Sequence, residues 1–178
     1  MQTPALAMAE TVGVVPMPAM PMPALGGEQE PSTGVDELVC KLIDLAEQAK
    51  ALELLSHLVH LNYEGAQFLS VHEFLKGRYE THLQQFDGLA EFVRTLDYLV
   101  PVCLNCGLEK LSCPLPELEA GSERHLLAYL KNLEAFGMAA KELVEVARSA
   151  EAPDVENYGA DLVADSFKAA WFIKSLLR

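Results

Sequence analysis

The sequence predicts an all-α protein, a bundle of four long helices with one long crossover between the second helix and the third. Apolar residues recur at spacings of three and four over four stretches, which is the period of a helix buried along one face. The connections between these stretches are short, long and short, and Pro101 and Pro153 mark two of the breaks. A chain of 178 residues is long enough to bury one core of this kind.

The four predicted helices cover residues 35–61, 68–98, 117–149 and 154–177. The first begins with Asp36 and Glu37, whose carboxylates suit the positive end of the helix dipole. Gly65 interrupts the pattern between the first two helices. The connection from 99 to 116 is too long for a helical hairpin, which indicates a crossover along the outside of the bundle, and residues 102–110 within it can form a short helix.

Residues 1–34 form a leader that is rich in Ala, Pro and Met and precedes the bundle of residues 35–178. Its prolines, densest in residues 16–23, forbid a helix or a central strand, so we expect a flexible, extended arm. Two interpretations of this apolar arm stay open. It lies along a neighbouring subunit, or the thioether sulfurs of its methionines bind Cu(I).

The charge of the chain argues against some functions and favours others. A net charge of −13, from 26 acidic and 13 basic residues, argues against a nucleic-acid-binding surface and suits a protein that attracts cations. The first basic residue is Lys41, so the N-terminus lacks the positive region of a signal peptide. No apolar run approaches 18 residues, so we expect no membrane span and a cytoplasmic location.

Three cysteines cluster in the long connection, at Cys103, Cys106 and Cys113. Cys103 and Cys106 form a CxxC motif, but no second CxxC completes a zinc site, and no strand pattern nearby supports a thioredoxin-like redox role. We interpret them as free thiols in a reducing cytosol.

The second predicted helix carries two pairs of residues with metal-ligand chemistry. His72 and Lys76 lie one helical turn apart, and so do Asp87 and Glu91 further along. The 15 residues from His72 to Asp87 return to within roughly 60° of the same face, at a distance of about 22 Å along the axis. One helix therefore cannot hold a single ion with both pairs, but two antiparallel copies related by a twofold axis near residues 80–81 can. The spacing predicts a His/carboxylate site between subunits.

Two motifs carry a resemblance to a known family. The first is His60-x4-Gly65-x2-Phe68-x3-His72-Glu73, followed by Asp87-x3-Glu91, and the second is Ala-Trp-Phe-Ile-Lys-Ser-Leu at residues 170–176. They resemble the signature and the last helix of the Dps family, the DNA-binding proteins from starved cells. The resemblance covers residues 35–178. It implies a ferritin-like four-helix bundle that assembles, through dimers, as a hollow dodecamer.

The resemblance also implies a function and a ligand set. In the family, a ferroxidase centre lies across the dimer twofold axis, so His60 and His72 would come from one chain and Asp87 and Glu91 from its partner. The centre oxidises Fe(II), typically with hydrogen peroxide and otherwise with dioxygen, and ferric mineral is stored inside the cage. Imidazole and carboxylate ligands suit Fe(II). The resemblance implies no organic cofactor, and Glu73 would face the cavity, where it helps to nucleate mineral.

Two positions depart from the family pattern. Lys76 stands where the family usually has a carboxylate, and an ammonium group is a poor ligand that repels metal ions. Lys76 can instead pair with Asp87 or Glu91 across the interface, which would weaken or remove one iron position. The alternative function is therefore a cage with an impaired centre, acting as a passive shell or as a sink for another metal.

The second departure is Leu61, where the family commonly has a tryptophan that is thought to scavenge radicals. The remaining candidates for that role are Tyr63, Tyr79 and Trp171.

Of the family's other properties, some are expected of this chain and others are not. Residues 1–40 contain no Lys or Arg for phosphate contacts, so we do not expect DNA binding. Asp154 and Glu156 fall where the family lines its threefold pores and would draw in Fe(II), although they also suit the N-terminus of the last helix. Three further histidines are read as structural: His57 as a cap at a helix end, and His82 and His125 as surface or hydrogen-bonded core residues.

Overall fold

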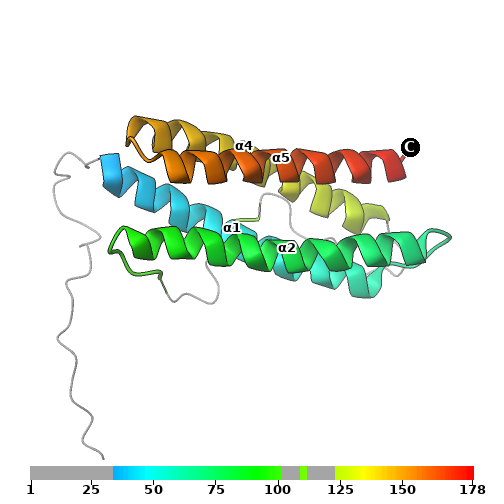
Figure 1. Ribbon diagram of the computed structural model, residues 1–178. Coiled ribbons are helices and arrows are strands. Elements are labelled where there is room, and N and C mark those ends of the chain that lie inside the picture. Colours follow the sequence, from blue (N-terminus) through cyan, green and yellow to red (C-terminus); the bar gives the residue numbers. More distant parts are fainter. Residues whose placement is uncertain (1–33, 102–108, 112–122) are drawn as a thin grey trace, which may run out of the picture. The chain divides into compact units, whose positions relative to one another are not determined.

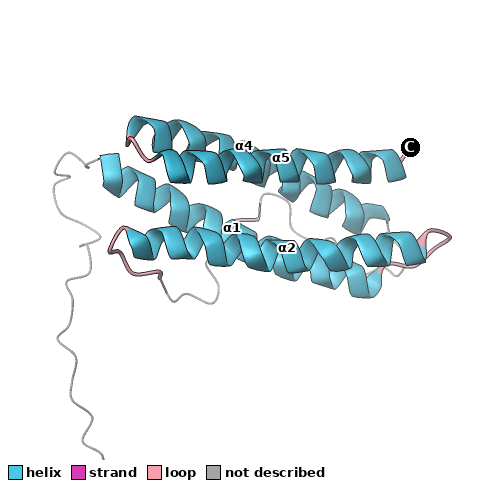
Figure 2. Ribbon diagram, viewed as in Figure 1, coloured by secondary structure: helices cyan, strands magenta, loops and turns pink. Residues whose placement is uncertain are grey.

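The computed structural model describes residues 34–101, 109–111 and 123–178, and these residues form helices joined by loops (Figures 1 and 2). The four helices are α1 (Gly34–Asn62), α2 (Phe68–Thr95), α4 (Glu123–Ser149) and α5 (Pro153–Leu176). The all-α fold class is confirmed, and the predicted helix ends that fall on described residues agree to within three residues. None of the described helices is both long and apolar enough to cross a membrane. The leader, most of the predicted short helix 102–110, the predicted start of the third helix at residue 117, and the three cysteines of the crossover lie outside the described residues.

The directions of the helices explain the long connection. Hydrogen bonds and ion pairs show that α1 is antiparallel to both α2 and α4, since Asp36 accepts from Tyr98, and Lys41 lies 2.7 Å from Glu142. The helices α2 and α4 therefore run in the same direction, with α5 reversed beside them (Figure 1). A chain that leaves the end of α2 must return along the bundle, about 40 Å for a helix of 28 residues, before α4 can begin.

The core lies between the four helices and is built from their apolar stripes. Fully buried side chains come from every helix: Leu42, Leu45 and Leu52 from α1, Leu75 and Leu89 from α2, Leu133, Phe136 and Leu143 from α4, and Ile173 from α5. Two glycines let α4 and α5 approach closely. A Cβ atom at Gly137 would lie 3.1 Å from the Ser166 side chain, and one at Gly159 would lie 3.0 Å from Val144.

The fold predicts a large difference between two neighbouring substitutions on α4. Phe136→Ala should lower the free energy of unfolding by about 3–5 kcal/mol, because the side chain is fully buried and leaves a cavity. Met138→Ala is the control, since Met138 is 54% exposed, and it should change the stability by about 0.5 kcal/mol or less. Urea unfolding followed by circular dichroism measures both. Equal effects would contradict the placement of the core.

Candidate metal site

The predicted histidine pair is brought together by the turn between α1 and α2. Gly65 makes this turn with φ of 133°, a conformation that other residues rarely adopt, and it accepts a hydrogen bond from the backbone nitrogen of Phe68. The turn places His60, near the end of α1, against His72, near the start of α2, with their rings stacked at 3.7 Å between centroids. His60 is buried, with 7% exposure, and His72 is half-buried.

The backbone fixes which nitrogen of each ring can bind a metal. His60 Nδ1 lies 2.8 Å from the carbonyl oxygen of His72, and His72 Nδ1 lies 3.2 Å from the carbonyl oxygen of His60. Because a carbonyl oxygen only accepts, each Nδ1 carries the proton and donates it. In the neutral rings this leaves a lone pair on both Nε2 atoms, and second-shell hydrogen bonds of this type orient metal-binding histidines.

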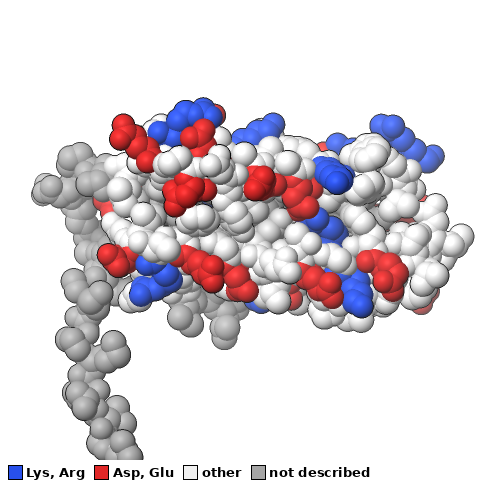
Figure 3. Space-filling view, in the orientation of Figure 1, with Lys and Arg blue, Asp and Glu red and all other residues white. Residues whose placement is uncertain are grey.

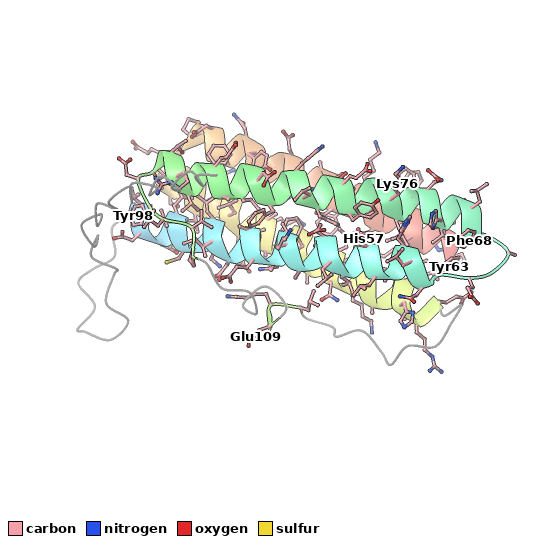
Figure 4. The ribbon with its side chains drawn as sticks, turned by 90° about the horizontal axis from the view of Figure 1, so that it is seen from below. His57, Tyr63, Phe68, Lys76, Tyr98 and Glu109 are labelled. Carbon is pink, nitrogen blue, oxygen red and sulfur yellow. The ribbon has the colours of Figure 1, made fainter. Side chains whose placement is uncertain are left out.

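Aromatic side chains surround the pair. Tyr79 presents its face to His57, with centroids 4.2 Å apart, and contacts His60 edge-on at 5.4 Å. Phe68 lies 5.0 Å from His72. Figure 4 shows His57, Tyr63, Phe68 and Lys76 at one end of the α1–α2 hairpin. Of the residues considered for radical scavenging, Tyr79 is therefore the one in ring contact with His60. Leu61, which replaces the tryptophan of the family, is exposed to solvent.

The predicted carboxylates lie elsewhere on the chain. Asp87 and Glu91 are exposed on α2, about 22 Å or more from His72 along the helix axis, so one chain does not bring the four predicted ligands together. Within the described residues, no group of three or more His, Cys, Asp or Glu side chains is arranged to hold a metal ion. Both carboxylates line a groove between α2 and α5 that also contains Tyr158 and Asp161.

This groove is electrically negative. Acidic side chains follow α2 and α5 along the face shown in Figure 3. Burial raises the pKa of Tyr158, and the charges of Glu91, Asp161 and Asp87 raise it further. The groove therefore favours cations.

The remaining predicted residues are also placed. Lys76 and Glu73 are exposed on α2, and the Lys76 ammonium makes no ion pair with a described residue. Asp154 is exposed in the first turn of α5, whereas Glu156 lies 2.8 Å from Arg148 of the same chain. The roles of Glu73, Asp154 and Glu156 in nucleation and in a pore stay predictions.

Sequence reasoning missed a cluster that we call the core polar network: the buried Arg78, His82, Gln85 and Tyr129, and the half-buried Asp165. Two guanidinium nitrogens of Arg78 donate to Asp165 at 2.9 and 2.7 Å, and the third donates to the Tyr129 hydroxyl at 3.3 Å. The Gln85 amide nitrogen donates to Asp165 at 2.9 Å, so the Gln85 oxygen accepts from His82 Nδ1 at 2.8 Å. His82 Nε2 then accepts from the Tyr129 hydroxyl at 2.8 Å.

This network joins α2, α4 and α5, and His82 is a hydrogen-bonded core residue, as one of its predicted interpretations had it. His125 differs, because it is buried but its Nε2 has no hydrogen-bond partner among the described residues. A signal for the network exists in the sequence: Arg78, His82 and Gln85 continue the inward stripe of Leu75 and Leu89 at helical spacing.

The network has shifted protonation equilibria. Burial, and then the charge of Arg78, lowers the pKa of His82 from 6.5 to about 3, so the ring stays neutral. Burial alone would raise the pKa of Asp165, but the hydrogen bonds and the charge of Arg78 outweigh it and hold that pKa below its ordinary value. Burial raises the pKa of Tyr129 to about 12. The network thus holds one guanidinium–carboxylate pair and neutral partners.

His82 should make stability depend on pH. Between about pH 6.5 and about pH 3 the unfolded chain binds a proton at this position and the folded chain does not, so the free energy of unfolding falls as the pH is lowered. His82→Gln should remove up to about 1.4 kcal/mol per pH unit of this slope. Urea unfolding at several pH values across the window measures it. An unchanged slope in the variant would show that His82 is not held neutral.

The order of the helices defines the class: a four-helix bundle in which the second and third helices are parallel and joined by a long crossover is ferritin-like. The chain belongs to the ferritin-like family, because the family model described as a ferritin-like domain matches residues 45–178. This agrees with the resemblance seen in the sequence motifs. No curated protein matches the chain by sequence.

Solved structures share this fold, and several of them are described as Dps proteins. Dps from Vibrio cholerae O1, described as a ferritin-like diiron-carboxylate protein, has a TM-score of 0.74 and 15% identity over 82% of this chain and 91% of its own. Dps from Staphylococcus aureus has a TM-score of 0.74 and 19% identity over 81% and 96%. CAIP from Helicobacter cinaedi has a TM-score of 0.72 and 27% identity over 79% and 99%. The fold of this chain is therefore the Dps fold.

Proposed function

We propose that this chain is a cytoplasmic, Dps-like protein for iron storage and detoxification. In this proposal it oxidises Fe(II), with hydrogen peroxide or dioxygen, at a centre shared across a dimer interface, and it stores ferric mineral in a dodecameric cage. The observation that carries the proposal is the reciprocal backbone clamp on His60 and His72, which leaves the Nε2 lone pair of each ring for a metal. The diiron-carboxylate description of the Vibrio cholerae protein supports iron as the substrate.

The centre of the bundle is poorly suited to be the site. Ferritin-like di-iron proteins that bind metal inside the bundle need inward Glu residues from two helices and a Glu-x-x-His motif from each of the other two. Among the described residues, the buried polar positions carry Ser, Asn, Gln, His and Arg, and the core polar network places a guanidinium there. A fixed cation repels metal ions, so the interface is the better candidate.

The outer face of the α1–α2 hairpin supports a twofold contact. Leu54, Leu58 and Leu61 are exposed at helical spacing on α1, and Leu83 is exposed on α2. Such apolar surface favours burial against a second copy. An axis near residues 80–81 would then set His72 opposite Asp87 and Glu91 of the partner subunit.

Each residue of the proposed centre would have a separate role in the oxidation of Fe(II). The Nε2 atoms of His60 and His72 coordinate Fe(II), and the partner's Asp87 and Glu91 supply anionic oxygen ligands, which favour Fe(III) over Fe(II). Two Fe(II) ions each lose one electron, and one hydrogen peroxide takes these electrons and two protons to form two waters. The acidic face along α2 and α5 raises the local concentration of Fe(II) (Figure 3).

Uptake and mineral growth are assigned to other carboxylates. Asp154 and Glu156 would ring a pore at a threefold axis, where the ion pair with Arg148 reduces the contribution of Glu156. Glu73, exposed beside His72, would nucleate mineral on the cavity side.

Lys76 supports the second candidate function. It lies one helical turn from His72 and is exposed on the same helix, so its ammonium opposes a metal ion at that end of the site. A cage impaired in this way would act as a passive shell or as a sink for another metal.

The test is anaerobic titration of the purified assembly with Fe(II), followed by peroxide, with absorbance of the ferric-oxo product as the measurement. We expect rapid oxidation by the wild type, and a loss of at least about tenfold in rate for His72→Ala and Asp87→Ala, because each removes a ligand. Glu145→Gln is the control, since this exposed carboxylate lies on α4, outside the α1–α2 hairpin, and is not an assigned ligand.

The second function makes a different prediction for the same experiment. Wild-type oxidation no faster than in protein-free buffer, together with rapid oxidation by Lys76→Asp, would show that Lys76 impairs the centre. Rapid oxidation that survives both His72→Ala and Asp87→Ala would contradict the proposed site.

A further inference from the structure

A third histidine, His57, lies beside the pair, although its position in the sequence had suggested a helix cap. His57 precedes His60 by one turn of α1, and their ring centroids are 5.9 Å apart. His57 is half-buried, and no hydrogen bond to a described residue holds its ring nitrogens. The three imidazoles of His57, His60 and His72 thus follow one another across the α1–α2 hairpin.

The distances between these rings decide which of them can bind the same metal ion. A coordinating imidazole nitrogen lies about 2.1 Å from a metal ion, so the ring centroid lies roughly 3.2 Å from it. Two imidazoles on one ion, at angles between about 90° and about 135°, then have centroids roughly 4.5–6 Å apart. The 5.9 Å between His57 and His60 lies at the wide end of this range, at an angle of about 135°. The 3.7 Å between His60 and His72 would need an angle of only about 70°, so these stacked rings suit two separate ions.

Tyr79 holds the first two rings in place. It is stacked on His57 with an interplanar angle of 24° and meets His60 at 75°. One phenol ring therefore restricts both imidazoles, which lowers the entropy lost when they bind the same ion. Tyr79 acts here as a positioning residue.

We propose that His57 is a further metal ligand, which forms with His60 a chelate for one ion, while His72 faces a second ion. This inference rests on the proposed function and deepens the same site. Lys76 lies one turn from His72, so its charge weakens metal binding at the second ion. The first ion, bound by His57 and His60, keeps two nitrogen donors. Nitrogen-rich sites bind Fe(II), Co(II) and Zn(II).

The test is titration of the full-length assembly with Co(II), whose visible spectrum reports ligand number and geometry. We expect one tight and one weak position for each histidine cluster. His57→Gln should weaken the tight position at least about tenfold, as His60→Gln does, because each removes a ligand. Glu53→Gln is the control, since this carboxylate lies one turn before His57 and pairs with Lys50.

A conservative variant separates ligation from packing. His57→Asp provides a new ligand and should restore tight binding and a changed Co(II) spectrum, which a loss of stacking on Tyr79 would not do. Unchanged affinity and spectrum in His57→Gln, with weakened binding in His60→Gln, would overturn this inference and leave the proposed function intact. Unchanged binding in both variants would overturn the proposed site as well.

Discussion

The length of α2 is the constraint on which the rest of this account depends. A straight helix keeps His72 and Asp87 about 22 Å apart, and burial of Leu75 and Leu89 in the core holds it in place. A centre that uses both ends of α2 is then complete only when two copies meet. Chemistry and assembly are coupled in this arrangement, because a free subunit has the histidines and the carboxylates but cannot use them together.

The core polar network makes the interior of the bundle a poor place for a metal ion, which is why the proposed site lies at its surface. Arg78 and Asp165 form an ion pair that joins α2 to α5, and the hydrogen bonds of His82 and Tyr129 extend it to α4. The interior of this bundle holds a fixed cation whose hydrogen-bond partners are Asp165 and Tyr129. His60 and His72 of the α1–α2 hairpin, in contrast, keep their Nε2 atoms available. In the proposed site, the charge of Lys76 weakens one metal position, and the additional donor of His57 strengthens the other.

Much of the fold was predictable because helical periodicity and prolines determine where helices begin and end. The long separation of His72 from Asp87 followed from the same periodicity. The resemblance implied that His60 and His72 belong to one site, but not that their rings stack. The core polar network did not follow from the periodicity, because apolar periodicity gives no weight to the polar Arg78 and His82, which occupy the inward stripe of α2. The stacking of Tyr79 on His57 depends on how α1 and α2 pack, which one sequence does not specify.

Subunit mixing tests the central claim, a site shared between two chains, most directly. One chain would carry His60→Gln and His72→Gln, and the other Asp87→Asn and Glu91→Asn, so neither assembles an intact site alone. In a mixed dimer the intact histidines of one chain meet the intact carboxylates of the other. Random co-assembly should therefore restore about one quarter of the wild-type number of active sites, measured as rapid Fe(II) oxidation. Mixtures as inactive as the two parents, despite confirmed mixed dimers, would contradict the shared site.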